Sequence, residues 1–183
     1  MRNILVLVDI QNDFITGSLA NKDADKKTNM IAEFLKTQHQ NFDGIVLTKD
    51  THSENYLNTD EGKRLPIPHC IKGTDGHEID KRIKILLDNY CNVFYIEKLH
   101  FMGDNDLLEA IFQFMDMDNC NDRDYVAITM CGFCTDICVV SNALLLKRDF
   151  PNITVIESLC SGTTKENHDA AIKVMKSCLI DIK

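Results

Sequence analysis

Residues 1–13, MRNILVLVDIQND, contain an apolar run at residues 4–8 that ends at the acidic Asp9. The run is short, rich in β-branched residues and continuous rather than alternating, which is typical of a strand buried on both faces. Such strands occur mainly in parallel sheets that helices cover on each side. No small-residue cleavage site follows the run, so we interpret it as a strand and not as a signal peptide.

Similar apolar segments recur along the chain and alternate with stretches of helical spacing. The further expected strands are residues 44–47, 92–96, 125–130, 153–156 and, as a short sixth strand, 179–182. The expected helices are residues 25–38, 78–87, 104–115, 135–147 and 165–176. This alternation predicts an α/β fold of three layers (α/β/α), with a doubly wound parallel sheet of five or six strands and right-handed crossovers.

Length and charge restrict the class of protein. A chain of 183 residues is long enough for one sizeable core and short for two, so we expect a single domain over residues 1–183. The net charge of −8 would repel nucleic acid and anionic membrane surfaces. No apolar stretch approaches the roughly 20 residues that cross a bilayer. We therefore expect a cytoplasmic protein with a small-molecule ligand and no nucleic-acid or membrane partner.

The chain has eight cysteines, and we expect them to be reduced because secretory features are lacking. Three of them follow the fourth expected strand with the spacing C-x-x-C-x-x-x-C. No second pair follows at zinc-site spacing, so this pattern does not favour a structural zinc. Apart from Cys138, we expect the cysteines to be small buried hydrophobic residues: Cys70, Cys91, Cys120, Cys131, Cys134, Cys160 and Cys178.

Residues with chemical potential stand directly after the strands. Asp9 follows the first, Asp50 and His52 follow the second, Lys98 follows the third, and Cys138 comes soon after the fourth. In a doubly wound sheet the ligand crevice lies beyond the carboxyl ends of the strands. The sequence therefore predicts that these side chains meet at one edge of the sheet.

Each of these residues also has a simpler interpretation. Asp9 either ends a strand by accepting backbone hydrogen bonds or acts as a general base near a thiol. Lys98 is either a solvated lysine, paired with Glu97, or a cation that lowers the pKa of neighbouring acids and holds a thiolate. Cys138 is either buried packing or a nucleophile in the first turn of a helix, where the helix dipole lowers the pKa of the thiol.

A metal site is predicted in the long polar segment of residues 49–77. Asp50-x-His52, followed by His69, supplies one carboxylate and two imidazoles. This set suits zinc, iron or manganese and leaves positions open for water or substrate. Glu61 is a candidate fourth ligand. The other acidic or imidazole side chains that we considered are expected to be solvated: Glu54, His77 and His100.

Five segments occur together in order: VDIQNDFITGSL (8–19), TKDTH (48–52), PHCIKGTDG (68–76), EK (97–98) and GFCTDICV (132–139). Together they resemble the isochorismatase-like cysteine hydrolases, specifically their nicotinamidase branch, across nearly the whole chain. The resemblance implies a parallel sheet flanked by helices and an Asp-Lys-Cys triad of Asp9, Lys98 and Cys138. It also implies a divalent metal, zinc first, on Asp50, His52 and His69, and a homo-oligomer.

The resemblance further implies a reaction. Asp9 takes the thiol proton, Cys138 attacks an amide carbonyl, and the thioester that forms is hydrolysed by water. It also implies a cis peptide between Phe133 and Cys134, an oxyanion hole from the backbone N–H groups of Cys134 and Cys138, and Phe14 as a pocket wall. The expected function is a cysteine-dependent amidohydrolase that converts nicotinamide to nicotinate and ammonia.

Two departures from the family pattern leave the substrate open. Many nicotinamidases have a tryptophan where this chain has Pro66, and the chain contains no tryptophan. The segment LHFMG at residues 99–103 also differs from the usual stretch with glycine and serine. The alternatives are hydrolysis of another small carboxamide or a catalytically silent binding protein.

Overall fold

The computed structural model describes residues 1–115 and 123–183. At its centre is a six-stranded sheet in the order β3-β2-β1-β4-β5-β6, and every neighbouring pair is parallel. The strands are β1 (Arg2–Val8), β2 (Gly44–Asp50), β3 (Val93–Lys98), β4 (Val126–Phe133), β5 (Asn152–Ser161) and β6 (Asp181–Ile182). The predicted parallel sheet, including its short sixth strand, is confirmed.

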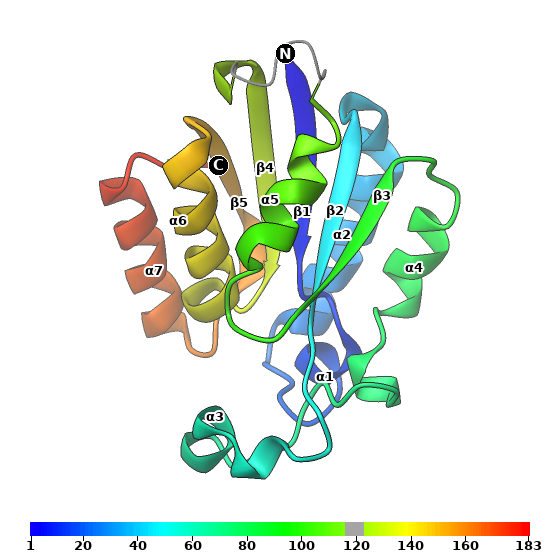
Figure 1. The fold of residues 1–183 in the computed structure, drawn as a ribbon, viewed down its shortest axis with the longest axis vertical. Helices are drawn as coiled ribbons and strands as arrows, with labels where there is room; N and C mark the ends of the chain where they lie inside the picture. The colour runs from blue at the N-terminus through cyan, green and yellow to red at the C-terminus, as the bar shows by residue number, and fades with distance from the viewer. Residues whose placement is uncertain (116–122) are drawn as a thin grey trace.

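Helices cover both faces of this sheet (Figure 1). One face carries α2 (Ala24–Gln38) and α4 (Lys81–Leu87), which pack against each other. The other face carries α5 (Asp104–Phe112), α6 (Val140–Asp149) and α7 (Lys165–Ser177). The three-layer, doubly wound architecture is therefore confirmed.

The central strand β1 explains why the N-terminal apolar run decides the fold. Residues 4–8 are completely buried, because β2 and β4 flank the strand and helices cover both faces. The chain winds away from β1 in one direction through β2 and β3, and in the other through β4 and β5. The switch point, where a doubly wound sheet opens a crevice, therefore lies between the carboxyl ends of β1 and β4.

Several elements differ from the expected pattern. Short helices that the sequence analysis did not predict are α1 (Asn12–Ile15) and α3 (Asp60–Arg64), and 3-10 turns lie at His39–Asn41, Tyr56–Asn58, Asp75–His77 and Arg123–Tyr125. The helix expected from residue 78 begins only at Lys81, because the Asp80 side chain accepts from the backbone of Arg82 and caps it. The helix expected over residues 135–147 starts as a π-helical turn, Thr135–Val139, before α6.

The buried-cysteine prediction is wrong at two positions. Cys91 and Cys178 are exposed, because both lie in the turns that follow helices α4 and α7 rather than on a core-facing element. Four others are buried as expected: Cys70, Cys131, Cys134 and Cys160. Cys120 lies outside the described residues. Within residues 1–115 and 123–183, no helix is both long and apolar enough to span a membrane.

Candidate active site and metal centre

Asp9, Lys98 and Cys138 come together at the carboxyl edge of the sheet. Lys98 Nζ lies 2.8 Å from Asp9 Oδ2 and 3.5 Å from Cys138 Sγ. Asp9 directly follows β1, Lys98 is the last residue of β3, and Cys138 lies in the π-helical turn after β4. All three side chains are buried. These three side chains therefore meet, as predicted. Lys98 is buried, so its simpler interpretation as a solvated lysine is wrong.

The backbone at the switch point turns sharply to present these groups. Asp9 has a φ of 49°, in the left-handed region that non-glycine residues rarely adopt. Thr48 Oγ1 donates to Asp9 Oδ1 at 2.7 Å and so holds the carboxylate in place. The peptide bond between Phe133 and Cys134 is cis, as the resemblance implies.

Gly132 allows β4 to approach β1 closely beside this site. Its φ is 131°, and a Cβ at this position would lie 2.1 Å from the carbonyl oxygen of Val8. Only glycine fits such a close backbone approach. The glycine in GFCTDICV is therefore required by the packing of the two central strands.

The charges in this cluster are strongly coupled. Burial opposes the ammonium of Lys98, but the negative charges of Asp9 and Asp50 beside it hold the pKa of Lys98 well above its usual value. Burial raises the pKa of Asp9, and the nearby Lys98 only partly offsets that effect. A cationic lysine thus lies between two buried acids.

The Cys138 thiol differs from the expectation of a lowered pKa at a helix start. Burial raises the pKa of Cys138 well above its usual value, and the negative charge of Asp9 adds to this, while Lys98 opposes it. Desolvation outweighs the helix terminus because the sulfur has almost no contact with solvent. Burial and the charge of Asp9 therefore act against a free thiolate at this position.

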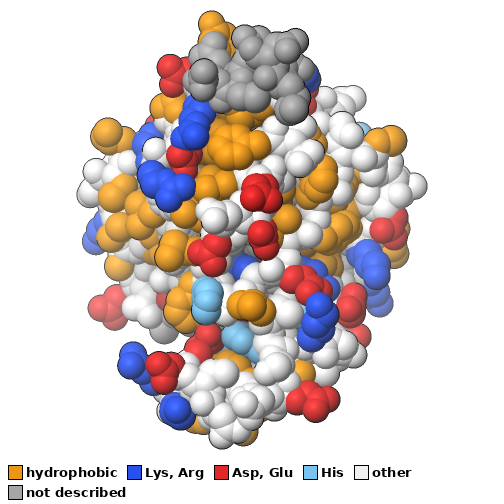
Figure 2. Space-filling view, viewed as in Figure 1, with side chains coloured by type: hydrophobic (Ala, Val, Ile, Leu, Met, Phe, Trp, Pro, Cys, Tyr) orange, Lys and Arg blue, Asp and Glu red, His pale blue; other side chains and the backbone are white. Residues whose placement is uncertain are grey.

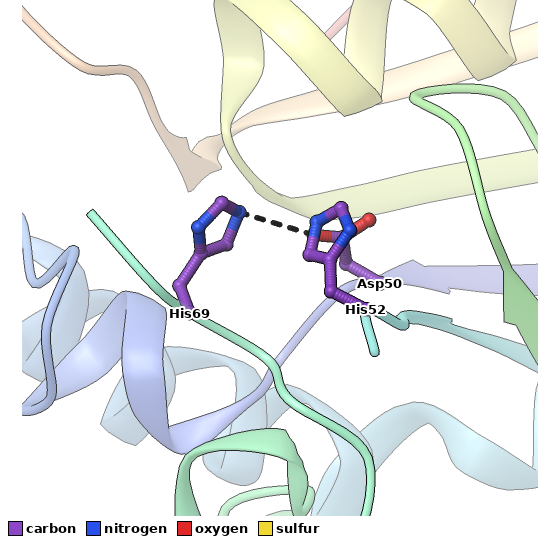
Figure 3. Close-up of side chains that lie close together, drawn as sticks. All are labelled: Asp50, His52 and His69. Atoms are coloured by element: carbon purple, nitrogen blue, oxygen red, sulfur yellow. Dashed lines mark ion pairs between the residues drawn. The ribbon is translucent and has the colours of Figure 1, made fainter. Parts of the chain in front are cut away.

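Asp50, His52 and His69 form a second cluster next to the first (Figure 3). Their ligand atoms lie within 4.8 Å of one another. His52 Nε2 is 2.9 Å and His69 Nε2 is 3.4 Å from Asp50 Oδ2. Although burial opposes its charge, contacts with the two histidines and Lys98 hold the pKa of Asp50 far below its usual value.

The donor set fits a divalent metal. His52 Nε2 is buried, and its 2.9 Å contact with Asp50 Oδ2 lacks hydrogen-bond geometry, so among the described residues this atom has no hydrogen-bond partner. His69 Nδ1 lies 2.9 Å from the Ile67 carbonyl, which leaves Nε2 facing the cluster, as is usual for metal-binding histidines. Glu61 Oε1 lies 3.7 Å from Nε2 of both histidines. Two imidazoles and one carboxylate, with a second carboxylate close by, match the ligands of zinc.

A cavity of about 620 Å³ connects the two clusters. Its lining includes Cys138, Cys134, Asp50 and His69, together with the aromatic rings of Phe14 and Phe101. Figure 2 shows a notch in the lower half of the molecule, with histidine and acidic side chains close to it. A polar reacting end and an apolar wall are typical of a site for a small organic ligand.

The other residues considered in the sequence lie outside these clusters. Glu54 and His100 are exposed, as predicted. His77 is buried, contrary to prediction, because its Nε2 pairs with Thr51 Oγ1 at 2.9 Å. Glu97 forms its ion pair with Lys72 rather than with Lys98.

Several supporting residues were not found by sequence reasoning. Gln11 clamps Asp50: its Nε2 donates to the Asp50 carbonyl and its Oε1 accepts from the Asp50 N–H. Asp13 accepts from the backbone N–H of Cys70 and so holds the loop beside His69. The Tyr56 ring packs 4.7 Å from that of His52. Gln11 and Asp13 belong to the quoted N-terminal motif, but their partners lie 39 and 57 residues away in the sequence.

Similar proteins support an assignment to a family. The sequence profile of the isochorismatase domain matches residues 3–182. The nicotinamidase of Schizosaccharomyces pombe is 25% identical and aligns with 97% of this chain and 91% of its own. The crystal structure of nicotinamidase/pyrazinamidase PncA from Bacillus subtilis is 26% identical, with a TM-score of 0.81, and covers 100% of this chain and 99% of its own.

A third relative is the pyrazinamidase of Pyrococcus horikoshii, solved in complex with zinc. It is 26% identical, with a TM-score of 0.78, and covers 100% of this chain and 99% of its own. The profile match covers nearly the whole chain, and its ends coincide with the first and last strands of the sheet. This chain belongs to the isochorismatase domain family.

Proposed function

We propose that the protein hydrolyses a small carboxamide, with Cys138 as nucleophile, Asp9 as general base and nicotinamide as the first substrate to test. The observation that carries the proposal is the position of Lys98 Nζ, 2.8 Å from Asp9 Oδ2 and 3.5 Å from Cys138 Sγ. A thiol, an acid and a cation within reach of one another form an activated-nucleophile arrangement. The relatives named nicotinamidase and pyrazinamidase support the choice of substrate.

The reaction proceeds in two halves. Asp9 takes the proton of the thiol as Cys138 Sγ bonds to the amide carbon. The backbone N–H groups of Cys134 and Cys138 stabilise the negative oxygen of the tetrahedral intermediate. The carbon–nitrogen bond then breaks, and Asp9 returns its proton to the leaving ammonia. Water hydrolyses the thioester, which releases the carboxylic acid and restores the thiol.

Lys98 and the metal cluster have separate tasks in this scheme. The ammonium of Lys98 stabilises the charge that passes between Asp9 and the sulfur. We propose that Asp50, His52 and His69 hold one zinc ion, with Glu61 as a candidate fourth ligand. Bound zinc would supply a positive charge and open coordination positions at the polar end of the cavity. Phe14 also lines the cavity, where its ring packs beside that of His69.

The test measures ammonia release from nicotinamide by the purified protein and by Cys138→Ala. We expect the variant to lose activity by at least about 10³-fold, as is usual when a nucleophile is removed. Cys178→Ala is the matched control, because Cys178 is exposed and does not line the cavity. Mass spectrometry of the quenched enzyme should find the acyl group on Cys138. Ammonia release by Cys138→Ala near the wild-type rate would reject the proposal. Rates of ammonia release from pyrazinamide and butanamide, measured beside nicotinamide, would rank the classes of amide as substrates.

A further inference from the structure

Residues 99–103, here called the wall loop, connect β3 to α5 and contribute one residue, Phe101, to the cavity lining. Phe101 lines the cavity together with Cys138. Leu99, Phe101 and Met102 are nevertheless among the exposed large hydrophobic residues, with Leu99 68% exposed. Side chains that are this open to solvent cannot hold a loop in one shape by packing alone. The position of Phe101 must therefore depend on how the loop backbone is held.

Asn142 on α6 provides most of that anchorage. It is fully buried, and its Oδ1 accepts from the Gly103 N–H at 2.8 Å. Its Nδ2 donates to the carbonyl of Phe101 at 3.0 Å and to that of Cys138 at 2.8 Å. One donor and two acceptors surround the amide, so its orientation is fixed. Lys98 adds a second anchor, because its Nζ donates to the His100 carbonyl at 3.2 Å.

The nucleophile and the pocket wall thus share the same two anchors. Asn142 touches the backbone of both Cys138 and Phe101, and Lys98 touches the sulfur as well as the loop. Phe101 and Phe14 both line the cavity, in a chain that has no tryptophan. The distance between an aromatic wall and the attacking sulfur is therefore set by hydrogen bonds that are buried or partly buried.

We propose that Asn142 is a positioning residue that fixes Phe101 relative to Cys138, so that the cavity favours carboxamides attached to a flat ring. This inference rests on the proposed amide hydrolysis and deepens it to a substrate class. A flat ring gains contact with an aromatic wall only if that wall is held at the correct place. Asn142 touches no substrate itself and acts through the wall loop.

The first experiment compares nicotinamide with butanamide in Asn142→Thr. A threonine hydroxyl in a helix can still bond to the carbonyl four residues earlier, so this variant keeps support for Cys138 but loses both loop bonds. We expect KM for nicotinamide to rise about tenfold, with kcat and both constants for butanamide changed less than about twofold. Leu99→Ala is the matched control, because Leu99 belongs to the same loop but does not line the cavity. It should leave all four constants unchanged.

The second experiment tests whether Asn142 acts through Phe101. Phe101→Ala should raise KM for nicotinamide in the wild-type background and have little further effect in Asn142→Thr, because coupled residues are non-additive. Equal losses for both amides, an unchanged Asn142→Thr, or additive effects of the two substitutions would each overturn the inference.

A binding measurement separates this inference from the proposed function. Isothermal titration of nicotinamide into Cys138→Ser, with and without Asn142→Thr, does not require turnover. We expect binding to weaken about tenfold in the double variant, in line with the KM effect. If Cys138→Ala kept its activity, the proposed nucleophile would be rejected, while the titration would still decide the role of the wall loop. Identical binding in the two backgrounds would overturn that role alone.

Discussion

Lys98 Nζ lies 3.1 Å from Oδ1 of Asp50, so one carboxylate joins the two clusters of the site. The other oxygen, Oδ2, faces His52 and His69. The Gln11 side chain bonds to both the N–H and the carbonyl of Asp50 and so holds the backbone from which this carboxylate extends. A change on either side of Asp50 is therefore expected to disturb the other.

Lys98→Met should lower both activity and stability. It leaves Asp9 and Asp50 buried without their shared cation, and breaking a buried pair from one side costs about 3–5 kcal/mol. Urea unfolding with and without zinc, together with ammonia release, provides the measurement. Lys72→Met is the control, since it breaks an exposed pair with Glu97 and should cost less than about 1 kcal/mol. Equal costs for the two variants would contradict this account of the buried cluster.

Zinc content should depend on the two histidines of the cluster. We expect elemental analysis to find about one zinc per chain in the wild-type protein and much less in His69→Ala, because three protein ligands are the usual number for an open zinc site. His100→Ala serves as the control, since His100 is exposed and absent from the cluster. Equal zinc in both variants would show that the metal binds elsewhere.

The sheet could be predicted from the sequence because its strands are continuous apolar runs, and the polar residue after each run marks the carboxyl edge. The short helix α3 was missed because Asp60–Arg64 has only five residues and little apolar pattern. The raised pKa of Cys138 was missed because it depends on burial and on Asp9, which is 129 residues away in the chain. Asn142 lies in an apolar helix, and its partners in the wall loop cannot be recognised without coordinates.

Gly132→Ala should be far more costly than Gly73→Ala. Both glycines have positive φ, but a Cβ on Gly132 would meet the Val8 carbonyl oxygen at 2.1 Å, whereas one on Gly73 has nothing within 4 Å. We expect a loss of about 4 kcal/mol or more at Gly132, and about 1–3 kcal/mol of backbone strain at Gly73. Urea unfolding of the two variants checks this, and similar losses would mean that the β1–β4 approach is not as tight as described.

Asp80→Asn should destabilise the protein at neutral pH and not in acid. Asp80 accepts from Arg82 Nε and Nη2 at 2.8 Å each. Although burial opposes its charge, these bonds hold the pKa of Asp80 below the ordinary 3.8. A folded-state pKa below the unfolded value gives stability that is fully present above about pH 4 and is lost as the pH falls through the folded-state pKa.

Urea unfolding from pH 7 to pH 3 should therefore find a difference of roughly 1 kcal/mol that shrinks at the acid end. Asparagine still caps α4, so Asp80→Ala should cost about 1 kcal/mol more at every pH. Asp60→Asn, which removes only an exposed contact with Lys63, should have little effect. A difference between wild type and Asp80→Asn that stayed constant from pH 7 to pH 3 would mean that the ionised carboxylate is not what stabilises this helix start.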